Sequence, residues 1–395
     1  MRYFYIVLCL LMVVQSHAHE ASTVAEKSQL AVSVAVDIHG QLWRVGVNQG
    51  FVEVSVSDDV GQTFSKAIRV NTGKQSITGR GEMRPDIAIG SDGEIYVTWM
   101  QNLSKHLTGY IWFSRSTDGG KSFEKPHIVH QDRTEIEHAF EELSVSPNGE
   151  LTIVWLDARD LEADKAAGKS RNSSSIYYTT SSNKGESFSS EQKLADYSCE
   201  CCRIATTTKP DGTVAVLWRH VFEGGERDHM MAEIPKAGEA VQLHRTTFGH
   251  WKLDGCPHQG AALARGAEGA DWWGYHLAYF DGKEKKPGLY YSRMDGEAWV
   301  GFPAKKFGDN TKQARHPALL SVDNNVWLAW LETSPNHTKA VMGMSSNDGG
   351  RTWSDAELLL SVEGKADHPQ LLQLKNKAYL VVNTDKGLKV TLVQP

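Results

Sequence analysis

The stretch Ser116-Thr117-Asp118-Gly119-Gly120-Lys121-Ser122-Phe123 decides the fold because its pattern recurs along the chain. Serine, an acid or amide, glycine, a hydroxyl residue and an aromatic ring stand at fixed spacing in four copies. The serine and the acid can bind backbone N–H groups of a tight turn, and glycine supplies the positive φ angle. A repeat of this range predicts a repeat architecture. The acid or amide position is held by Asp59, Asp118, Asn183 and Asp348.

A second repeat lies between these turns. It is an apolar run, a turn and a second strand that often ends in tryptophan. Seven such hairpins predict an all-β propeller of seven blades with about four strands each. The last blade lacks a recognisable fourth strand, and the stretch before Leu30 is the candidate to supply it. The seven hairpins are Leu30–Val47, Arg84–Trp99, Glu141–Trp155, Arg203–Trp218, His258–Tyr279, Arg315–Trp330 and His368–Val382.

The four turns resemble the Asp-boxes, or BNR repeats, of the sialidase superfamily of β-propellers. The resemblance covers nearly the whole mature chain. It implies that each turn joins the third and fourth strands of a blade, on the side away from the active site. Sialidases have six blades, so six is the alternative to the seven that the hairpins favour. The resemblance by itself carries no activity.

The first residues are typical of a secretory signal. Arg2 is followed by the apolar run Ile6–Val14 and by Ser16-His17-Ala18, which fits a cleavage site. We expect residues 1–18 to be the signal and residues 19–395 to form a single propeller domain, exported to the periplasm or out of the cell. No later segment is long and apolar enough to span a membrane. A net charge of −6 gives no nucleic-acid signature.

One mouth of the predicted channel collects unusual residues. The first strand of each blade lines the axis, so all the strand starts meet there. All four cysteines of the mature chain fall in two adjacent loops at this mouth, and three histidines align beside them. Thiolates and imidazoles are ligands of copper(I) and zinc, and Cys-x-Cys-Cys departs from the usual zinc spacing, which favours copper. The predicted ligands are Cys199, Cys201, Cys202, Cys256 and His258, with His316 and His368 as further partners.

Disulfide formation is the alternative for these cysteines. An exported protein with four cysteines is expected to oxidise them, and Cys256 would bridge to the neighbouring loop. The adjacent pair Cys201-Cys202 cannot bridge to itself without strain, so both would need partners elsewhere. Disulfides would make the protein a stapled extracellular interaction scaffold.

Three arginines also align at the mouth, each fifteen residues before a blade tryptophan: Arg84, Arg203 and Arg315. Three guanidinium groups would bind a carboxylate, and the resemblance implies such a trio for sialic acid. The family's Arg-Ile-Pro motif is absent, because Pro85 directly follows Arg84. The alternative is that the arginines pair with nearby acids such as Asp86. Further catalytic candidates are Glu141, Glu142 and Asp157.

The leading hypothesis is an exported propeller that binds a metal at the channel mouth, with copper ahead of zinc, in a binding or redox role. An exo-α-sialidase-type glycoside hydrolase is the rival enzyme hypothesis. The ligand at the mouth is accordingly expected to be a metal, a glycan or another small molecule.

Overall fold

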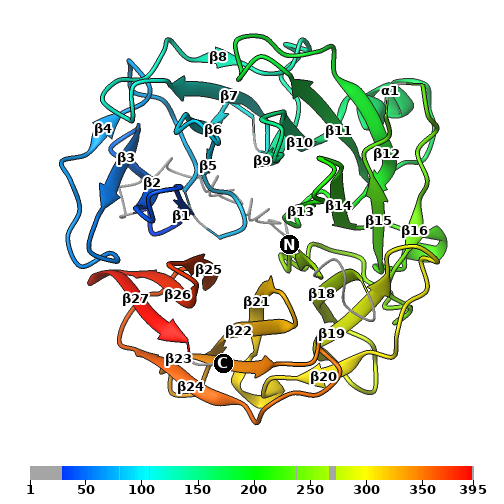
Figure 1. The fold of residues 1–395 in the computed structure, drawn as a ribbon. Helices are drawn as coiled ribbons and strands as arrows, with labels where there is room; N and C mark the ends of the chain where they lie inside the picture. The colour runs from blue at the N-terminus through cyan, green and yellow to red at the C-terminus, as the bar shows by residue number, and fades with distance from the viewer. Residues whose placement is uncertain (1–28, 80, 106, 237, 267–272, 394–395) are drawn as a thin grey trace, which may run out of the picture.

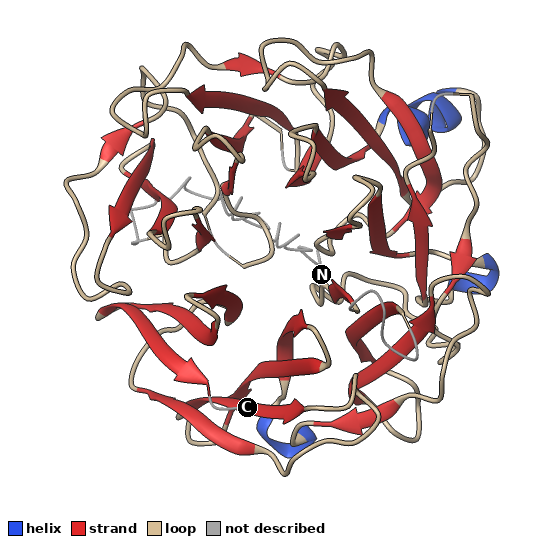
Figure 2. Cartoon of the chain, viewed as in Figure 1, coloured by secondary structure: helices blue, strands red, loops and turns tan. Residues whose placement is uncertain are grey.

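Seven small sheets stand in a ring around a central axis (Figures 1 and 2). The computed structural model describes residues 29–393 except 80, 106, 237 and 267–272. The predicted secretory signal and the stretch proposed to complete the last blade lie outside these residues. Six sheets have four strands and the seventh has three, so the prediction of seven blades is confirmed and six is excluded. No helix in the described part of the chain has the length and apolarity needed to cross a membrane.

The strands run outward from the axis in chain order within each blade, and all neighbours are antiparallel. Blades one to four contain β1 (Val32–Val36), β2 (Leu42–Asn48), β3 (Phe51–Ser57), β4 (Ile68–Arg69); β5 (Asp86–Ile89), β6 (Ile95–Asn102), β7 (Gly109–Ser116), β8 (His127–Ile128); β9 (His138–Val145), β10 (Leu151–Asp157), β11 (Ser174–Ser181), β12 (Gln192–Ser198); and β13 (Ala205–Thr208), β14 (Val214–Arg219), β15 (His229–Glu233), β16 (His244–Arg245).

Blades five to seven follow in the same order, and the short helices lie in connections outside the sheets. The blades contain β17 (Ala262–Arg265), β18 (Gly274–Asp281), β19 (Gly288–Asp295), β20 (Lys305–Phe307); β21 (Arg315–Val322), β22 (Asn325–Thr333), β23 (Lys339–Ser346), β24 (Glu357–Val362); and β25 (Gln370–Leu374), β26 (Lys377–Thr384), β27 (Gly387–Val393). The helices are α1 (Arg159–Ala166) and the 3₁₀ turns Glu223–Gly225 and Asn310–Lys312.

Side chains of the seventh blade close the ring against the first blade. The Val32 amide donates to Asp367 Oδ2 over 3.2 Å, and Gln370 Nε2 donates to the Val32 carbonyl over 2.8 Å. Asn383 Nδ2 binds the Leu30 carbonyl, also over 2.8 Å. The innermost strands β1 and β25 are in contact as a result. Within the described residues, polar side chains therefore hold the last blade to the first, and the added strand stays a prediction.

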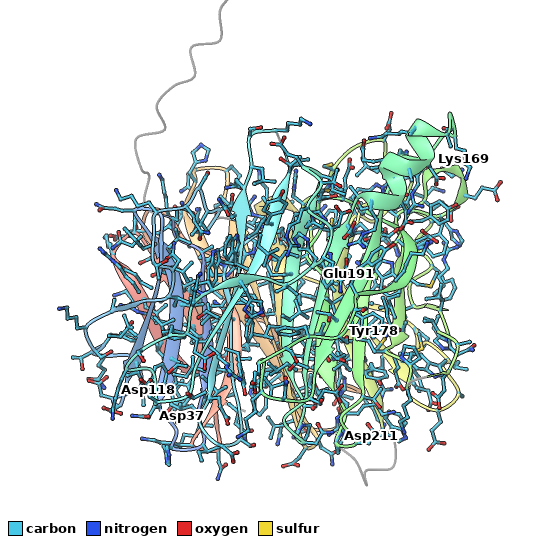
Figure 3. The ribbon with its side chains drawn as sticks, turned by 90° about the horizontal axis from the view of Figure 1, so that it is seen from above. Asp37, Asp118, Lys169, Tyr178, Glu191 and Asp211 are labelled. Atoms are coloured by element: carbon cyan, nitrogen blue, oxygen red, sulfur yellow. The ribbon has the colours of Figure 1, made fainter. Side chains whose placement is uncertain are left out.

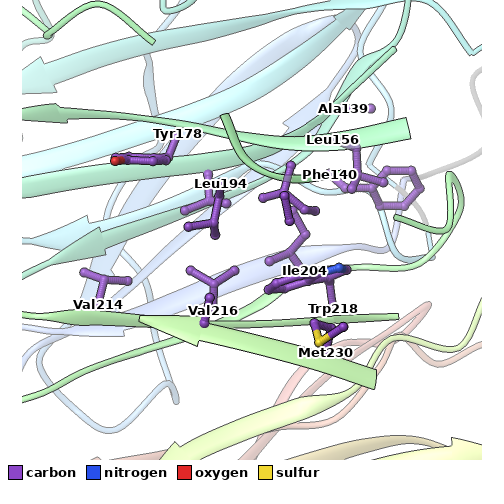
Figure 4. Close-up of a cluster of buried hydrophobic side chains, with 14 of the residues drawn as sticks. Ala139, Phe140, Leu156, Tyr178, Leu194, Ile204, Val214, Val216, Trp218 and Met230 are labelled. Carbon is purple, nitrogen blue, oxygen red and sulfur yellow. The ribbon is translucent and has the colours of Figure 1, made fainter. Parts of the chain in front are cut away.

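The core lies between neighbouring blades. Each of the four blade tryptophans, Trp99, Trp155, Trp218 and Trp330, is at most 1% exposed. Figure 4 shows the seam between blades three and four, where Leu156 of β10 and Trp218 of β14 belong to one apolar cluster. Alternating side chains of each strand thus fill the space on both sides of every sheet.

The four repeated turns form one hydrogen-bond pattern. In the second blade, the Gly120 amide donates to Ser116 Oγ over 2.9 Å and the Ser122 amide donates to Asp118 Oδ1 over 3.0 Å. Each turn joins the third and fourth strands of its blade, as the resemblance implied. Figure 3 shows Asp118 at the same face as the hairpin residues Asp37 and Asp211, whereas Lys169 lies at the opposite face.

The turn glycines also pack against the preceding blade. Gly120 has φ +79°, and a Cβ atom there would lie 2.6 Å from the Trp43 ring of the first blade. Its neighbour Gly119 has φ +70° but faces open space. Each turn therefore joins two blades as well as two strands.

We expect Gly120→Ala to be more destabilising than Gly119→Ala. Both variants force alanine into the left-handed region, which costs about 1–2 kcal/mol. Only Gly120→Ala also drives a methyl group into Trp43, an overpacking that adds about 1–3 kcal/mol. Chemical denaturation of both variants measures the difference in free energy of unfolding. Equal losses would show that the contact between blades does not require glycine.

Candidate functional site

The mouth at the strand starts is shaped by residues with left-handed backbone. Phe140 has φ +55° and His316 has φ +53°, and each lies at a register shift of its innermost strand. His258, in the loop before β17, has φ +48°. Non-glycine residues rarely adopt this conformation, and β-bulges re-aim side chains next to functional sites. The backbone thus turns side chains of blades three, five and six at the place where the sequence concentrates its unusual residues.

The four cysteines converge at this mouth, as predicted. The sulfurs of Cys199, Cys201 and Cys202 lie within 4.8 Å of one another, and all three residues are buried. Cys201 also forms a second group with Cys256 and His258, which are exposed. All four cysteines are free, and the Cys199 and Cys201 sulfurs are 3.6 Å apart. The structure therefore joins the five first-choice ligands in two triads that share Cys201.

A buried arginine faces the cysteines. Arg219, at the end of β14, is 2% exposed. Its guanidinium donates to the carbonyls of Arg227, Gln259 and Phe280 over 2.9–3.0 Å. Burial disfavours the Cys202 thiolate, but hydrogen bonds from the Cys199 and Cys201 thiols and the charge of Arg219 outweigh burial and hold the pKa of Cys202 well below its usual range. The neighbouring thiols and the charge of Arg219 thus favour a thiolate in this cluster, and the thiolate is the state that binds metals.

A second group of ligand atoms lies beside the cysteines. Glu82, His316 and His368 offer one atom each within 4.8 Å. Glu82 Oε1 is 3.1 Å from His316 Nδ1 and 3.8 Å from His368 Nδ1. The two histidines were expected to complete the cysteine site, but the structure assembles them with Glu82 instead. Burial raises the pKa of Glu82, but the His316 hydrogen bond and the charge of Arg203 outweigh it and the pKa is lowered.

The three aligned arginines have different surroundings. Arg84 forms two parallel 2.9 Å hydrogen bonds with Asp367, so it pairs with an acid as the alternative expected, and that acid is Asp367 in place of Asp86. Arg203 lines the channel cavity and donates to the Ala261 carbonyl over 3.3 Å. Arg315 is outside that lining, and its Nε is buried without a hydrogen bond in the described structure. The trio is therefore not a single open anion clamp.

Carboxyl groups line the channel below the mouth, in a cavity of about 240 Å³. Burial and the nearby charge of Asp86 together raise the pKa of Glu141 to about 8 and that of Glu142 well above its usual range. Burial also raises the pKa of Asp86. Protonated carboxyls are the form that donates a proton in acid catalysis.

We expect the stability of the protein to fall as the pH rises from 4.5 to about 8, in part because of Glu141. Over this window the unfolded chain ionises Glu141 while the folded chain keeps it protonated, so the free energy of unfolding decreases. Glu141→Gln removes this loss. Unfolding midpoints at both ends of the window should differ less in Glu141→Gln than in the wild type. Glu357→Gln, at an exposed position, is the control, and an unchanged pH dependence in Glu141→Gln would contradict the assignment.

Asp157, the remaining catalytic candidate, lies away from the channel cavity at the end of β10. Its Oδ2 accepts from Trp155 Nε1 over 2.9 Å, and the Arg159 guanidinium binds both oxygens over 2.7 and 2.9 Å. Its side chain is fully buried. These contacts make Asp157 an anchor for the start of α1.

Sequence reasoning missed three residues of the mouth: Glu82, Arg219 and Asp367. Glu82 stands two positions before the aligned Arg84, and Asp367 directly precedes the aligned His368. Because Glu82 and Asp367 stand next to residues that the hairpin alignment places at the mouth, the alignment could have identified them as mouth residues. Arg219 directly follows a blade tryptophan and carried no signal, because an arginine at a strand end is ordinarily exposed.

The sequence matches no family model and no curated protein. Among solved structures, the polysaccharide lyase Uly1 is similar with a TM-score of 0.52 and 10% identity, over 94% of this chain and 90% of that chain. The Hadza microbial sialidase Hz136 is similar with a TM-score of 0.50 and 14% identity, over 88% of this chain and 74% of that chain. At these identities the likeness shows a shared fold, and this is the fold that the repeated turns implied.

Proposed function

We propose that this protein is an exported propeller that binds a thiophilic metal ion at its channel mouth, copper(I) before zinc. The observation that carries the proposal is the convergence of four free cysteines and His258 in two triads joined through Cys201. Soft thiolate ligands select Cu(I), and imidazole is compatible with both metals. The proposed export rests on the signal-like first eighteen residues.

The surroundings of the sulfurs support this proposal. Arg219 supplies a buried positive charge, which offsets the negative charge that several thiolates place on a Cu(I) centre. Cys256 and His258 are exposed whereas the other three cysteines are buried, so an ion can arrive at the outer triad and pass to the inner one through Cys201. This gradient of exposure suits binding or transfer of the metal.

The test is metal analysis of protein purified under reducing, oxygen-free conditions. We expect stoichiometric uptake of Cu(I) in competition with a colorimetric Cu(I) chelator, and weaker uptake of Zn(II). A metal-free protein that takes up neither ion would overturn the proposal. Mass mapping without reductant provides an independent result, because two native disulfides in the isolated protein would favour the scaffold alternative.

A glycan-processing enzyme is the second candidate. The observation that favours it is the channel cavity, where the carboxyls of the buried Glu141 and the half-buried Glu142 lie in the lining together with Arg203. A raised pKa suits a general acid, and an arginine suits an acidic sugar. Turnover of a fluorogenic sialoside or an acidic polysaccharide that is lost in Arg203→Ala would support this candidate. Absence of turnover on both substrate types would remove it.

A further inference from the structure

Three blades bring Glu82, His316 and His368 to one point of the mouth. Glu82 precedes β5, His316 is the second residue of β21, and His368 precedes β25. Their ligand atoms all lie within 4.8 Å of one another. Glu82 also lines the channel cavity. The group therefore lies between the mouth and the channel, and it shares no residue with the cysteine triads.

The two oxygens of the Glu82 carboxylate have different partners. Its Oε2 accepts from the backbone amides of Gly260 and Arg203 over 3.1 and 3.4 Å. Its Oε1 faces the two imidazoles. The amides fix the orientation of the carboxylate, and Oε1 remains available as a single oriented ligand atom.

His368 contains an unsatisfied nitrogen. The residue is 7% exposed, and its Nδ1 is buried without a hydrogen-bond partner in the described structure. Its ring stacks on that of His316 with centroids 3.5 Å apart and an interplanar angle of 15°. A buried nitrogen without a partner costs about 1–3 kcal/mol, so such a group calls for an explanation.

A second stacked histidine pair in the same protein allows a comparison, and it also has a buried nitrogen without a hydrogen bond, His138 Nε2, at 3.7 Å from Asp157 Oδ2. His130 and His138 stack with centroids 3.8 Å apart and an interplanar angle of 4°. Each Nδ1 of this pair contacts a backbone carbonyl, that of Asp132 over 2.6 Å and that of Gly109 over 3.1 Å. The corresponding Nδ1 of His368 instead faces only a carboxylate oxygen at 3.8 Å. The two pairs thus differ in the groups that their Nδ1 atoms face.

We propose that Glu82, His316 and His368 bind a divalent cation, Zn²⁺ or Cu²⁺, beside the cysteine cluster. Two imidazoles and one carboxylate are a ligand set for borderline divalent metals, whereas Cu(I) prefers the thiolates. An ion there would satisfy His368 Nδ1 and would replace the proton shared by His316 and Glu82. Three protein ligands leave a further coordination position for water or a small ligand from the channel.

The charges around the proposed site act on a cation in both directions. Arg203 lies close enough to Glu82 to stabilise its negative charge, which opposes a nearby cation. The carboxyls of Asp86, Glu141 and Glu142 line the same cavity as Arg203. Arg84 is neutralised by Asp367 through two hydrogen bonds. Burial raises the pKa of Glu141 and Glu142, so these carboxyls add little negative charge. The charge that favours a cation is therefore that of Glu82 itself, and the charges of Arg203 and Arg315 oppose it.

The experiment uses Zn²⁺ as the probe and the full chain in a Cys202→Ser/Cys256→Ser background, which weakens the thiolate cluster and keeps all three proposed ligands. Isothermal titration is expected to show one bound Zn²⁺ and a Zn²⁺-dependent rise in the unfolding midpoint. Adding Glu82→Gln or His368→Gln should lower the Zn²⁺ affinity by at least about tenfold. His138→Gln, in the matched stacked pair, should leave the affinity unchanged.

A measurement on wild-type protein covers the case in which these variants fail to fold. Cu²⁺ added to wild-type protein whose thiols have first been saturated with Ag⁺, so that they neither bind nor reduce Cu²⁺, should give an electron paramagnetic resonance spectrum with hyperfine splitting from two nitrogens. No Zn²⁺ binding in the cysteine-depleted background, or full affinity in both Glu82→Gln and His368→Gln, would overturn this site. The Glu82 site and the cysteine triads share no residue. Failure of Cu(I) uptake by the wild type would therefore contradict the proposed function without contradicting the divalent-cation site.

Discussion

Cys202→Ser is expected to lower the Cu(I) affinity of the mouth by at least about hundredfold, because it removes the thiolate around which the buried triad is built. The Cys202 sulfur lies within 4.8 Å of those of Cys199 and Cys201, and the charge of Arg219 favours a negative charge on it. Serine keeps the size of the side chain but is a poor ligand for a soft ion. Competition titration with a Cu(I) chelator measures the change.

Cys256→Ser is the matched control. Cys256 is exposed and belongs only to the outer triad with Cys201 and His258, so its loss leaves the buried sulfurs in place. We expect a smaller fall in Cu(I) affinity than for Cys202→Ser. Equal affinity in the wild type and Cys202→Ser would show that the buried triad does not hold the ion. Near-ultraviolet circular dichroism checks that each variant is folded.

Asp367→Ala is expected to lower the free energy of unfolding by about 3–5 kcal/mol, because it leaves a buried guanidinium without its counter-charge. Asp367 and Arg84 have side chains 2% and 10% exposed and are joined by two 2.9 Å hydrogen bonds. Asp367 also accepts from the amide of Val32 in the first blade. The substitution thus weakens the joint that closes the ring. Urea denaturation measures the loss.

Two further variants distinguish the cost of the unpaired Arg84 charge from the loss of the contacts between the first and last blades. Asp385→Ala changes an exposed aspartate of the same blade and should have little effect on stability. Arg84→Met combined with Asp367→Leu removes both charges and should recover much of the loss, because no buried charge is left unpaired. A single Asp367→Ala variant as stable as the wild type would show that the joint does not depend on this pair.

The parts of the fold that the sequence predicted depend on local hydrogen bonds and on the alternation of side chains. The hydrogen bonds of the turn around Asp118 and Gly120 all form within one octapeptide. Its recurrence could therefore be recognised from the sequence alone. The hairpins are likewise local, and their number gave seven blades. The side-chain contacts that join the last blade to the first were not predicted, because Asp367 and Val32 are 335 residues apart and neither segment has a sequence feature that identifies the other as its partner.

The candidate site was predicted in its location and only in part in its composition. Aligning the hairpins brought the cysteines and histidines to one mouth, which the structure confirms. The same alignment grouped His316 with the cysteines, whereas the structure pairs it with Glu82 of another blade. Aligning the hairpin sequences predicts the position of a residue along the propeller axis. It does not predict the direction in which the side chain points.

The sequence by itself determined the blades, their strand order and the mouth at which the unusual residues gather, because these follow from turns and hairpins whose interactions are nearly all local. Only the tertiary structure decided which residues meet there. Closing the ring brings strand starts that are hundreds of residues apart into contact, and left-handed residues such as His316 rotate the side chains at that mouth. The residues that contact Glu82, Arg84 and Cys202 therefore depend on how the ring closes and on how the left-handed residues orient the side chains.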